Sequence, residues 1–172
     1  MVAWYVEDNA RWYLRQALGR NRFDYVIDAQ PSRRIPDTVR APYSGVTAAR
    51  LVRATWGEAD CWVVALGSND LIFSGGSPGV AVSMIAVVTP GSRAWWVNLN
   101  YRRDPRYSFD FAGATAVFNE HLLARAAVTA RLTVIDWHTL SAQHPGWFFD
   151  PVHVDSVGSR SRAEQVVAAL VG

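Results

Sequence analysis

Short apolar runs alternate along this chain with longer segments of helical periodicity. Runs of this length, separated by stretches that can each hold a helix, are typical of parallel strands joined by crossover helices. The pattern therefore predicts an α/β fold in which helices cover both faces of a parallel sheet. Five strands are predicted, over residues 2–6, 23–29, 61–66, 94–99 and 132–136.

The helices between these runs have recognisable ends. Gly19 is placed to end a first helix, Ser44 to cap a second, and Pro90 to stop a third. The predicted helices span residues 10–18, 45–55, 80–88, 112–130 and 161–171. With 172 residues, half of them hydrophobic, the chain is long enough for one substantial core. We predict a single domain over residues 1–172.

Charge and composition argue against several classes of function. Every basic residue is arginine, but the net charge is only +2, which is too small an excess to predict nucleic-acid binding. The first residues lack the basic start and apolar stretch of a signal peptide, and no segment is long enough to predict a membrane span. We expect a soluble protein that is either cytoplasmic or part of a larger exported assembly.

Polar residues follow the third predicted strand, where ligands of parallel sheets collect. Gly67 allows a tight exit from the strand, and Asn69 can direct its amide into a cleft to hold an oxyanion. Asn and Asp are also ordinary turn formers, so the segment Gly67-Ser68-Asn69-Asp70 is a weak signal by itself.

A second group lies near the C-terminus. Asp150 and His153 are three residues apart, a spacing at which the carboxylate can fix the imidazole tautomer and leave the ring as a general base. The same pair can instead serve as a turn and a helix cap. The remaining histidines show no spacing typical of metal ligands, so the sequence predicts neither a metal nor another cofactor.

Together these motifs resemble the SGNH hydrolases, also called GDSL esterases, over essentially the whole chain. The resemblance implies a flavodoxin-like three-layer α/β/α sandwich with a five-stranded parallel sheet. It implies a proton relay of His153 and Asp150, and an oxyanion donor at Asn69. Trp137 and Trp147 resemble features of carbohydrate-linked bacterial members, which suggests stacking on a sugar ring.

The chain departs from the family at two motifs. Where the family has Gly-Asp-Ser, this sequence has Glu7-Asp8-Asn9, so an amide stands at the nucleophile position, with Asp8 beside it as a candidate binding residue. Where the second motif has Gly, this chain has Ser32, whose backbone N–H is a candidate oxyanion donor together with Gly67 and Asn69. An amide nitrogen does not attack esters, so the usual acyl-enzyme route is excluded on this alignment.

Three functions remain open on this evidence. The chain can be an inactive or weakly active esterase-like domain that binds a small-molecule or glycan ester. It can be a hydrolase by another route, with His153 activating water or Ser32 replacing the nucleophile. It can also be a structural module of a larger protein assembly.

Overall fold

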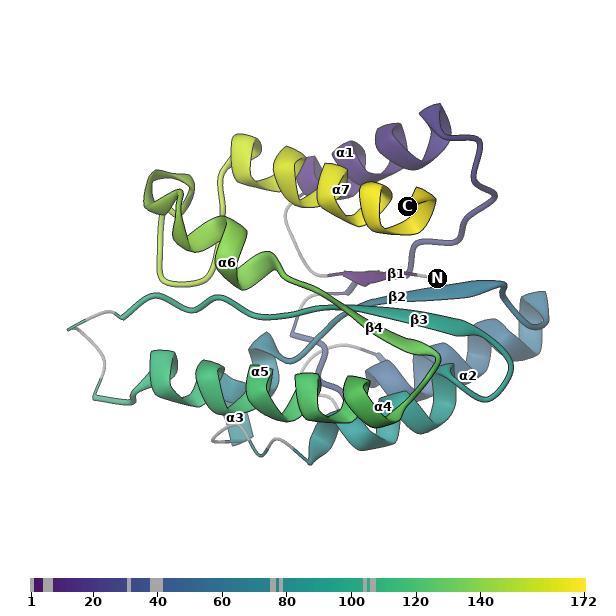
Figure 1. The fold of residues 1–172 in the computed structure, drawn as a ribbon, viewed down its shortest axis with the longest axis horizontal. Coiled ribbons are helices and arrows are strands. Elements are labelled where there is room, and N and C mark those ends of the chain that lie inside the picture. The colour runs from purple at the N-terminus through teal and green to yellow at the C-terminus, as the bar shows by residue number, and fades with distance from the viewer. Residues whose placement is uncertain are drawn as a thin grey trace.

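The computed structural model describes residues 2–4, 8–30, 32–37, 42–74, 77, 79–103, 105 and 108–172. Figure 1 shows a sheet with helices on both faces, which gives the three-layer α/β/α arrangement. In chain order the elements are β1 (Val2–Trp4), α1 (Asp8–Arg20), α2 (Gly45–Trp56), β2 (Cys61–Ala65), α3 (Ser68–Ser74), α4 (Val80–Val88), β3 (Arg93–Val97), α5 (Phe111–Val128), β4 (Leu132–Ile135), α6 (Trp137–Ala142), the 3-10 helix η1 (Pro145–Trp147) and α7 (Ser156–Val171).

The sheet is parallel, with the strand order β1-β2-β3-β4. Trp4 of β1 is in register with Ala65 of β2, and Trp96 of β3 with Val134 of β4. All four strands therefore end at one edge of the sheet. This edge is where the predicted site residues after β1 and β2 must lie.

The prediction of a five-stranded sheet is wrong for the described residues. The predicted second strand, residues 23–29, is not a strand; Ile27 alone takes part in a β-bridge. The carbonyl groups at the end of this segment are bound by side chains instead of a ladder. Arg11 donates to the carbonyl of Ala29, and Arg33 donates to the carbonyl of Asp28 at 3.3 Å.

The core lies on both faces of the sheet because side chains alternate along the strands. Trp62 and Val64 of β2 are buried in a cluster that also contains residues of α2, α4 and α5. Val63, between them, is buried on the opposite face against α1 and α7. Figure 1 shows the same division, with α1 and α7 on one side and α2, α4 and α5 on the other.

The predicted helices are present, with shifted ends. Ser44 caps α2 as expected, its hydroxyl accepting from the Thr47 N–H at 3.1 Å, and α4 has the predicted bounds. Gly19 lies inside α1 and does not end it. Helix α7 begins five residues earlier than predicted, at Ser156, because Asp155 caps it. Among the described helices, none is both long and apolar enough to cross a bilayer.

Candidate functional site

The chain leaves β2 through a turn that only glycine can make. Gly67 has φ +124°, and a Cβ added there would lie 2.8 Å from Cζ of Phe118. The N–H of Leu71 then donates to the Gly67 carbonyl, so α3 starts directly after the strand. This short helix, which the sequence analysis treated as a turn, places Ser68 and Asn69 at the carboxyl edge of the sheet.

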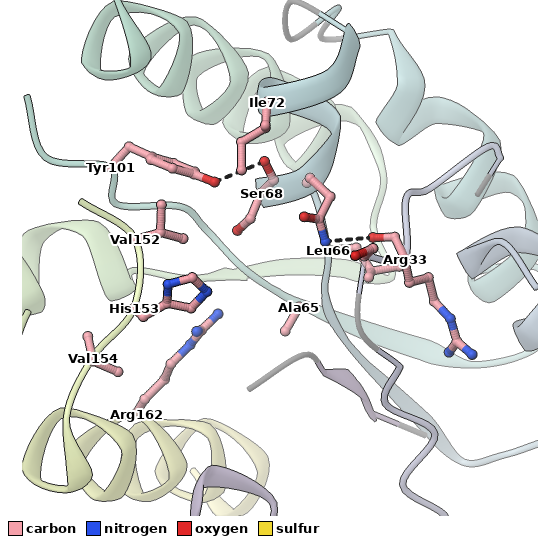
Figure 2. A pocket seen from close by; sticks show the side chains of 13 residues that line it. Arg33, Ala65, Leu66, Ser68, Ile72, Tyr101, Val152, His153, Val154 and Arg162 are labelled. Carbon is pink, nitrogen blue, oxygen red and sulfur yellow. Dashed lines mark hydrogen bonds between the residues drawn. The ribbon is translucent and has the colours of Figure 1, made fainter. Parts of the chain in front are cut away.

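Asn69 connects this edge to the loop of the second motif. Its side-chain N–H donates to the carbonyl of Arg33 at 3.1 Å (Figure 2). A carboxamide has two N–H donors, so one can hold the loop while the other serves a ligand oxygen. Ser32, the residue before Arg33, lines the same cleft and has a left-handed backbone with φ +57°. Such a backbone is one that glycine adopts most readily, which fits the glycine expected here from the family resemblance.

Buried charged groups hold in place the loop that carries Ser32 and Arg33, here called the second-motif loop. Arg33 is 2% exposed, and its guanidinium donates to the Asp28 carboxylate at 3.0 Å and to the Tyr43 carbonyl at 3.2 Å. Asp70 is fully buried and accepts from the Ile35 N–H at 3.1 and 3.2 Å. Burial raises the pKa of Asp70 to about 7, although the bonds from Ile35 act in the opposite direction. Asp70 therefore has a structural role beside Asn69.

The predicted pair of Asp150 and His153 is formed. Nδ1 of His153 lies 2.6 Å from Oδ2 of Asp150, while Oδ1 accepts from the N–H groups of Val152 and His153, both at 2.7 Å. Burial alone would raise the pKa of Asp150, but the bonds from His153 and Val152 outweigh it and lower the pKa. The carboxylate is thus held ionised and fixes the ring through Nδ1. Acid–base chemistry of this ring belongs to Nε2.

A closed loop presents the pair to the cleft. Phe148 and Val154 form an antiparallel bridge, and the Asp155 N–H donates to the Trp147 carbonyl at 2.7 Å. Helix α7 follows at once and packs closely on the loop, since a Cβ on Gly158 would lie 2.8 Å from Cβ of Val154. The loop is therefore positioned by the helix that follows it.

The two groups of residues meet in one cleft of about 240 Å³ (Figure 2). Its described walls are formed by Ser32, Arg33, Ala65, Leu66, Gly67, Ser68, Asn69, Ile72, Tyr101, Val152, His153, Val154 and Arg162. The structure thus brings together four predicted residues (Ser32, Gly67, Asn69 and His153), with Asp150 behind the imidazole. A volume of this size suits one sugar residue or a short acyl group better than a larger ligand.

Two predicted residues are only partly described. The backbone of Asp8 and Asn9 forms the first turn of α1, which follows β1 at the carboxyl edge of the sheet. Their side chains, like all of Glu7, lie outside the described part of the chain. The assignment of Asn9 to the nucleophile position and of Asp8 to ligand binding therefore stays a prediction.

The two tryptophans predicted to stack on a sugar are placed elsewhere. Trp137 is 3% exposed and stacks on Trp147 with ring centroids 6.0 Å apart. The Trp147 ring is also stacked against His144, at 4.0 Å. Neither tryptophan is among the described residues of the cleft wall. This prediction is not supported, because the two rings pack mainly against each other.

Arg162 is a cleft residue that the sequence analysis missed. It lies on α7, one helical turn before the buried Val166. Residues four apart share a helix face, so a charged residue is found in line with the buried face of α7. That conflict between charge and position is the sequence signal that would have identified it.

Solved structures with a similar fold include an O-acetyltransferase domain, a carbohydrate acetylesterase family member and an aryl esterase. The C-terminal catalytic domain of peptidoglycan O-acetyltransferase A from Streptococcus pneumoniae superposes with a TM-score of 0.75 at 17% identity, over 99% of this chain and 90% of that chain. A carbohydrate acetylesterase family member from Sinorhizobium meliloti gives 0.75 at 19% identity, over 97% and 88%. The aryl esterase of M. smegmatis gives 0.71 at 16% identity, over 98% and 87%.

The α/β fold that the resemblance to SGNH hydrolases implied is therefore confirmed, because these solved structures share it over nearly the whole chain. At these identities the neighbours define the architecture and not the reaction. No protein-family model matches the sequence, and no curated protein sequence matches it significantly.

Proposed function

We propose that this protein binds an O-acylated ligand, in particular an O-acetylated carbohydrate, and hydrolyses it slowly or not at all. One observation carries the proposal: His153, fixed by Asp150 at 2.6 Å, lines the same cleft as Asn69 and Ser32. A general base and amide donors around one small cleft suit an acyl group and its carbonyl oxygen. The fold is shared with acetylesterases, which supports the same class of ligand.

The expected lack of turnover rests on residue 9. By the motif resemblance to the SGNH hydrolases, we expect Asn9 to take the place of the serine nucleophile. Its amide nitrogen is delocalised into the carbonyl and cannot be activated by imidazole. Loss of the serine in such enzymes can lower turnover by roughly 10⁶-fold, although binding and oxyanion stabilisation survive.

A hydrolytic function by another route is the second candidate. Ser32 lines the cleft together with His153, so its hydroxyl is available as a substitute nucleophile after a rearrangement of the loop. A water molecule activated directly by His153 is the other form of this candidate. Both depend on His153, so one set of variants tests them together.

The test is a titration with an O-acetylated methyl glycoside, followed by NMR, together with an assay for released acetate. We expect saturable binding by the wild type, several-fold weaker binding by His153→Ala, and no acetate release above that of His153→Ala. His144→Ala is the matched control, because His144 stacks on Trp147 outside the described cleft wall.

The outcomes separate the candidates. A clear His153-dependent release of acetate would overturn the expected lack of turnover. If that rate disappears in Ser32→Ala, the serine is the substitute nucleophile; if it stays, water activation is favoured. A folded wild type that binds none of a broad panel of acetylated glycans would favour the structural module instead.

A further inference from the structure

A second hollow lies between α1 and α7, which cover the same face of the sheet side by side (Figure 1). Its volume is about 190 Å³. The floor is formed by Ala17 and Ala163, which are 3% and 1% exposed. Their methyl groups are too short to fill the space between the helices, and longer side chains stand around them. None of the described residues of this hollow belongs to the wall of the cleft that holds His153.

Trp12 forms an aromatic wall of this hollow. The residues of α1 that are buried in the core are Leu14, Ala17 and Leu18. Trp12 lies outside that core and is 55% exposed. Its ring meets the ring of Tyr13 at 78°, with the centroids 5.0 Å apart. An exposed indole that is supported by a neighbouring ring offers a ligand a flat apolar surface of defined orientation.

Polar side chains of both signs surround the indole. Gln16 and Arg20 follow Trp12 at intervals of four residues, so they share its face of α1. Arg160 and Glu164 face them from α7, and the Arg160 guanidinium lies over the neighbouring tyrosine ring at 5.1 Å. Gln16, Arg20 and Glu164 are exposed and form no hydrogen bond or ion pair with the described residues. Their polar ends are therefore available to a ligand.

This combination of groups selects the class of ligand. An anion would meet the carboxylate of Glu164, and a cation would meet the guanidinium groups of Arg20 and Arg160. A wholly apolar molecule would remove water from all of these groups and satisfy none of them. A sugar hydroxyl both donates and accepts hydrogen bonds, so it can bond guanidinium, carboxylate and carboxamide groups together. A pyranose ring with equatorial hydroxyls also has an apolar face of C–H groups that can lie on an indole.

We propose that the hollow between α1 and α7 is a carbohydrate-binding site that takes one neutral pyranose ring, stacked on Trp12 and hydrogen-bonded to Gln16, Arg20 and Glu164. The volume of about 190 Å³ suits one ring of a small ligand, and the open groove lets the rest of a glycan continue into solvent. The site goes beyond the proposed function, because it requires neither an acyl group on the ligand nor His153.

The experiment is an NMR titration of the wild type with cellotriose, a neutral trisaccharide without an acyl group. The reporter is the indole N–H signal of Trp12, identified by its absence in Trp12→Phe. Sorbitol is the matched ligand control, because it carries similar hydroxyls without a ring face, and inorganic phosphate is the control for anion binding. Trp56→Ala is the matched protein control, since Trp56 is 69% exposed on α2, outside the described wall of this hollow.

We expect cellotriose to shift the Trp12 signal saturably, with a Kd on the order of millimolar, and sorbitol and phosphate to leave it unchanged. Trp12→Ala should weaken cellotriose binding about tenfold or more, as the loss of a stacking contact would give. Trp12→Phe should weaken binding less, and Trp56→Ala should bind like the wild type. Circular dichroism verifies that each variant is folded.

A separate variant keeps the proposal testable if Trp12→Ala does not fold. Glu164→Gln changes an exposed side chain and removes the charged acceptor from the hollow, so it should weaken cellotriose binding several-fold. Unchanged cellotriose binding in this variant would then overturn the proposal.

Four other results would overturn it. Cellotriose can fail to shift the Trp12 signal, or it can bind folded Trp12→Ala as tightly as the wild type, which would place the sugar elsewhere. A saturable shift with phosphate would show an anion site instead. A Trp12 signal that moves with protein concentration in the absence of sugar would show that a second copy of the chain covers this face. In each case the proposed function of the cleft still stands, because cellotriose carries no acyl group.

Discussion

At the scale of the residue, Ser32 has a backbone conformation that its side chain disfavours. Its φ of +57° lies in the left-handed region, which costs a residue with a side chain about 1–2 kcal/mol. The loop is held there from both sides, by the bond from Asn69 to the Arg33 carbonyl and by the ion pair of Arg33 with Asp28. The surrounding contacts therefore impose a conformation that serine alone would avoid.

Ser32→Gly should stabilise the protein by roughly 0.5–1 kcal/mol. Glycine removes the free-energy cost of the left-handed backbone. Its greater conformational freedom in the unfolded chain offsets part of that stabilisation. Urea denaturation followed by circular dichroism measures the change in the free energy of unfolding.

Ser32→Ala is the control for this prediction. Alanine removes the hydroxyl but keeps the strained backbone, so its stability should stay within about 0.5 kcal/mol of the wild type. A Ser32→Gly variant less stable than Ser32→Ala would show that the left-handed conformation of Ser32 is not what limits stability here.

At the scale of the element, α7 both anchors the loop that carries His153 and contributes a residue to the cleft. Its N-cap, Asp155, accepts from the Gly158 N–H at 2.8 Å, and its own N–H donates to the Trp147 carbonyl at 2.7 Å. One residue thus ties the helix start to the loop that carries Asp150 and His153. Two turns further along the chain, the same helix supplies Arg162 to the cleft.

Asp155→Ala should lower the free energy of unfolding by about 1 kcal/mol, as expected for the loss of an N-cap. Amide hydrogen exchange should also become faster over residues 148–158, because the cap and the loop share this anchor. The control is Asp110→Ala, which removes the cap of α5, an acceptor for the Gly113 N–H at 3.0 Å. It should cost similar stability and leave exchange in residues 148–158 unchanged.

Equal amide hydrogen exchange over residues 148–158 in Asp155→Ala and Asp110→Ala would contradict the proposed link between the α7 cap and the loop that carries His153.

Helix α7 was predictable from its apolar spacing, but its first residue was not. The predicted start of α7 is residue 161, because no apolar periodicity precedes that point. The cap at Asp155 and the close packing of Gly158 on Val154 are tertiary features.

At the scale of the whole molecule, the cleft is made by segments from distant parts of the chain. Its walls come from the second-motif loop, the exit of β2, the segment after β3, the loop before α7 and α7 itself. The parallel sheet brings the exit of β2 and the segment after β3 to one edge, and the bonds of Asn69 and Asp70 to the second-motif loop hold that loop there. The antiparallel bridge and α7 then bring the His153 loop over that edge.

If the site is otherwise intact, one double variant should restore hydrolysis. Glu7→Gly with Asn9→Ser recreates the Gly-Asp-Ser turn of the SGNH hydrolases, with a hydroxyl in place of the amide. We expect measurable release of acetate or of an aryl alcohol from short-chain esters, at least tenfold above the wild type, and loss of that activity when His153→Ala is added.

Glu7→Gly alone is the control, since it changes the turn without supplying a hydroxyl. A folded double variant with no activity above this control would contradict the placement of the first motif at residues 7–9.

The sequence by itself determined the α/β class, most of the element positions and the pair Asp150 and His153. Strands β2, β3 and β4 lie within two residues of their predicted ends, and α4 matches at both ends. These features depend on local periodicity and on spacing within a few residues, which a single sequence carries. Gly67 and Asn69 could also be predicted as site residues, because they follow an apolar strand.

Only the tertiary structure decided what those residues do together. It placed Arg162 beside His153 (Figure 2), and it occupied one Asn69 donor with the Arg33 carbonyl. It also packed Trp137 on Trp147, with neither ring in the described cleft wall. It also replaced the predicted second strand by a segment whose carbonyls bind arginine side chains. Each of these outcomes depends on contacts between residues far apart in the chain, and local patterns do not encode which distant partner a group will meet.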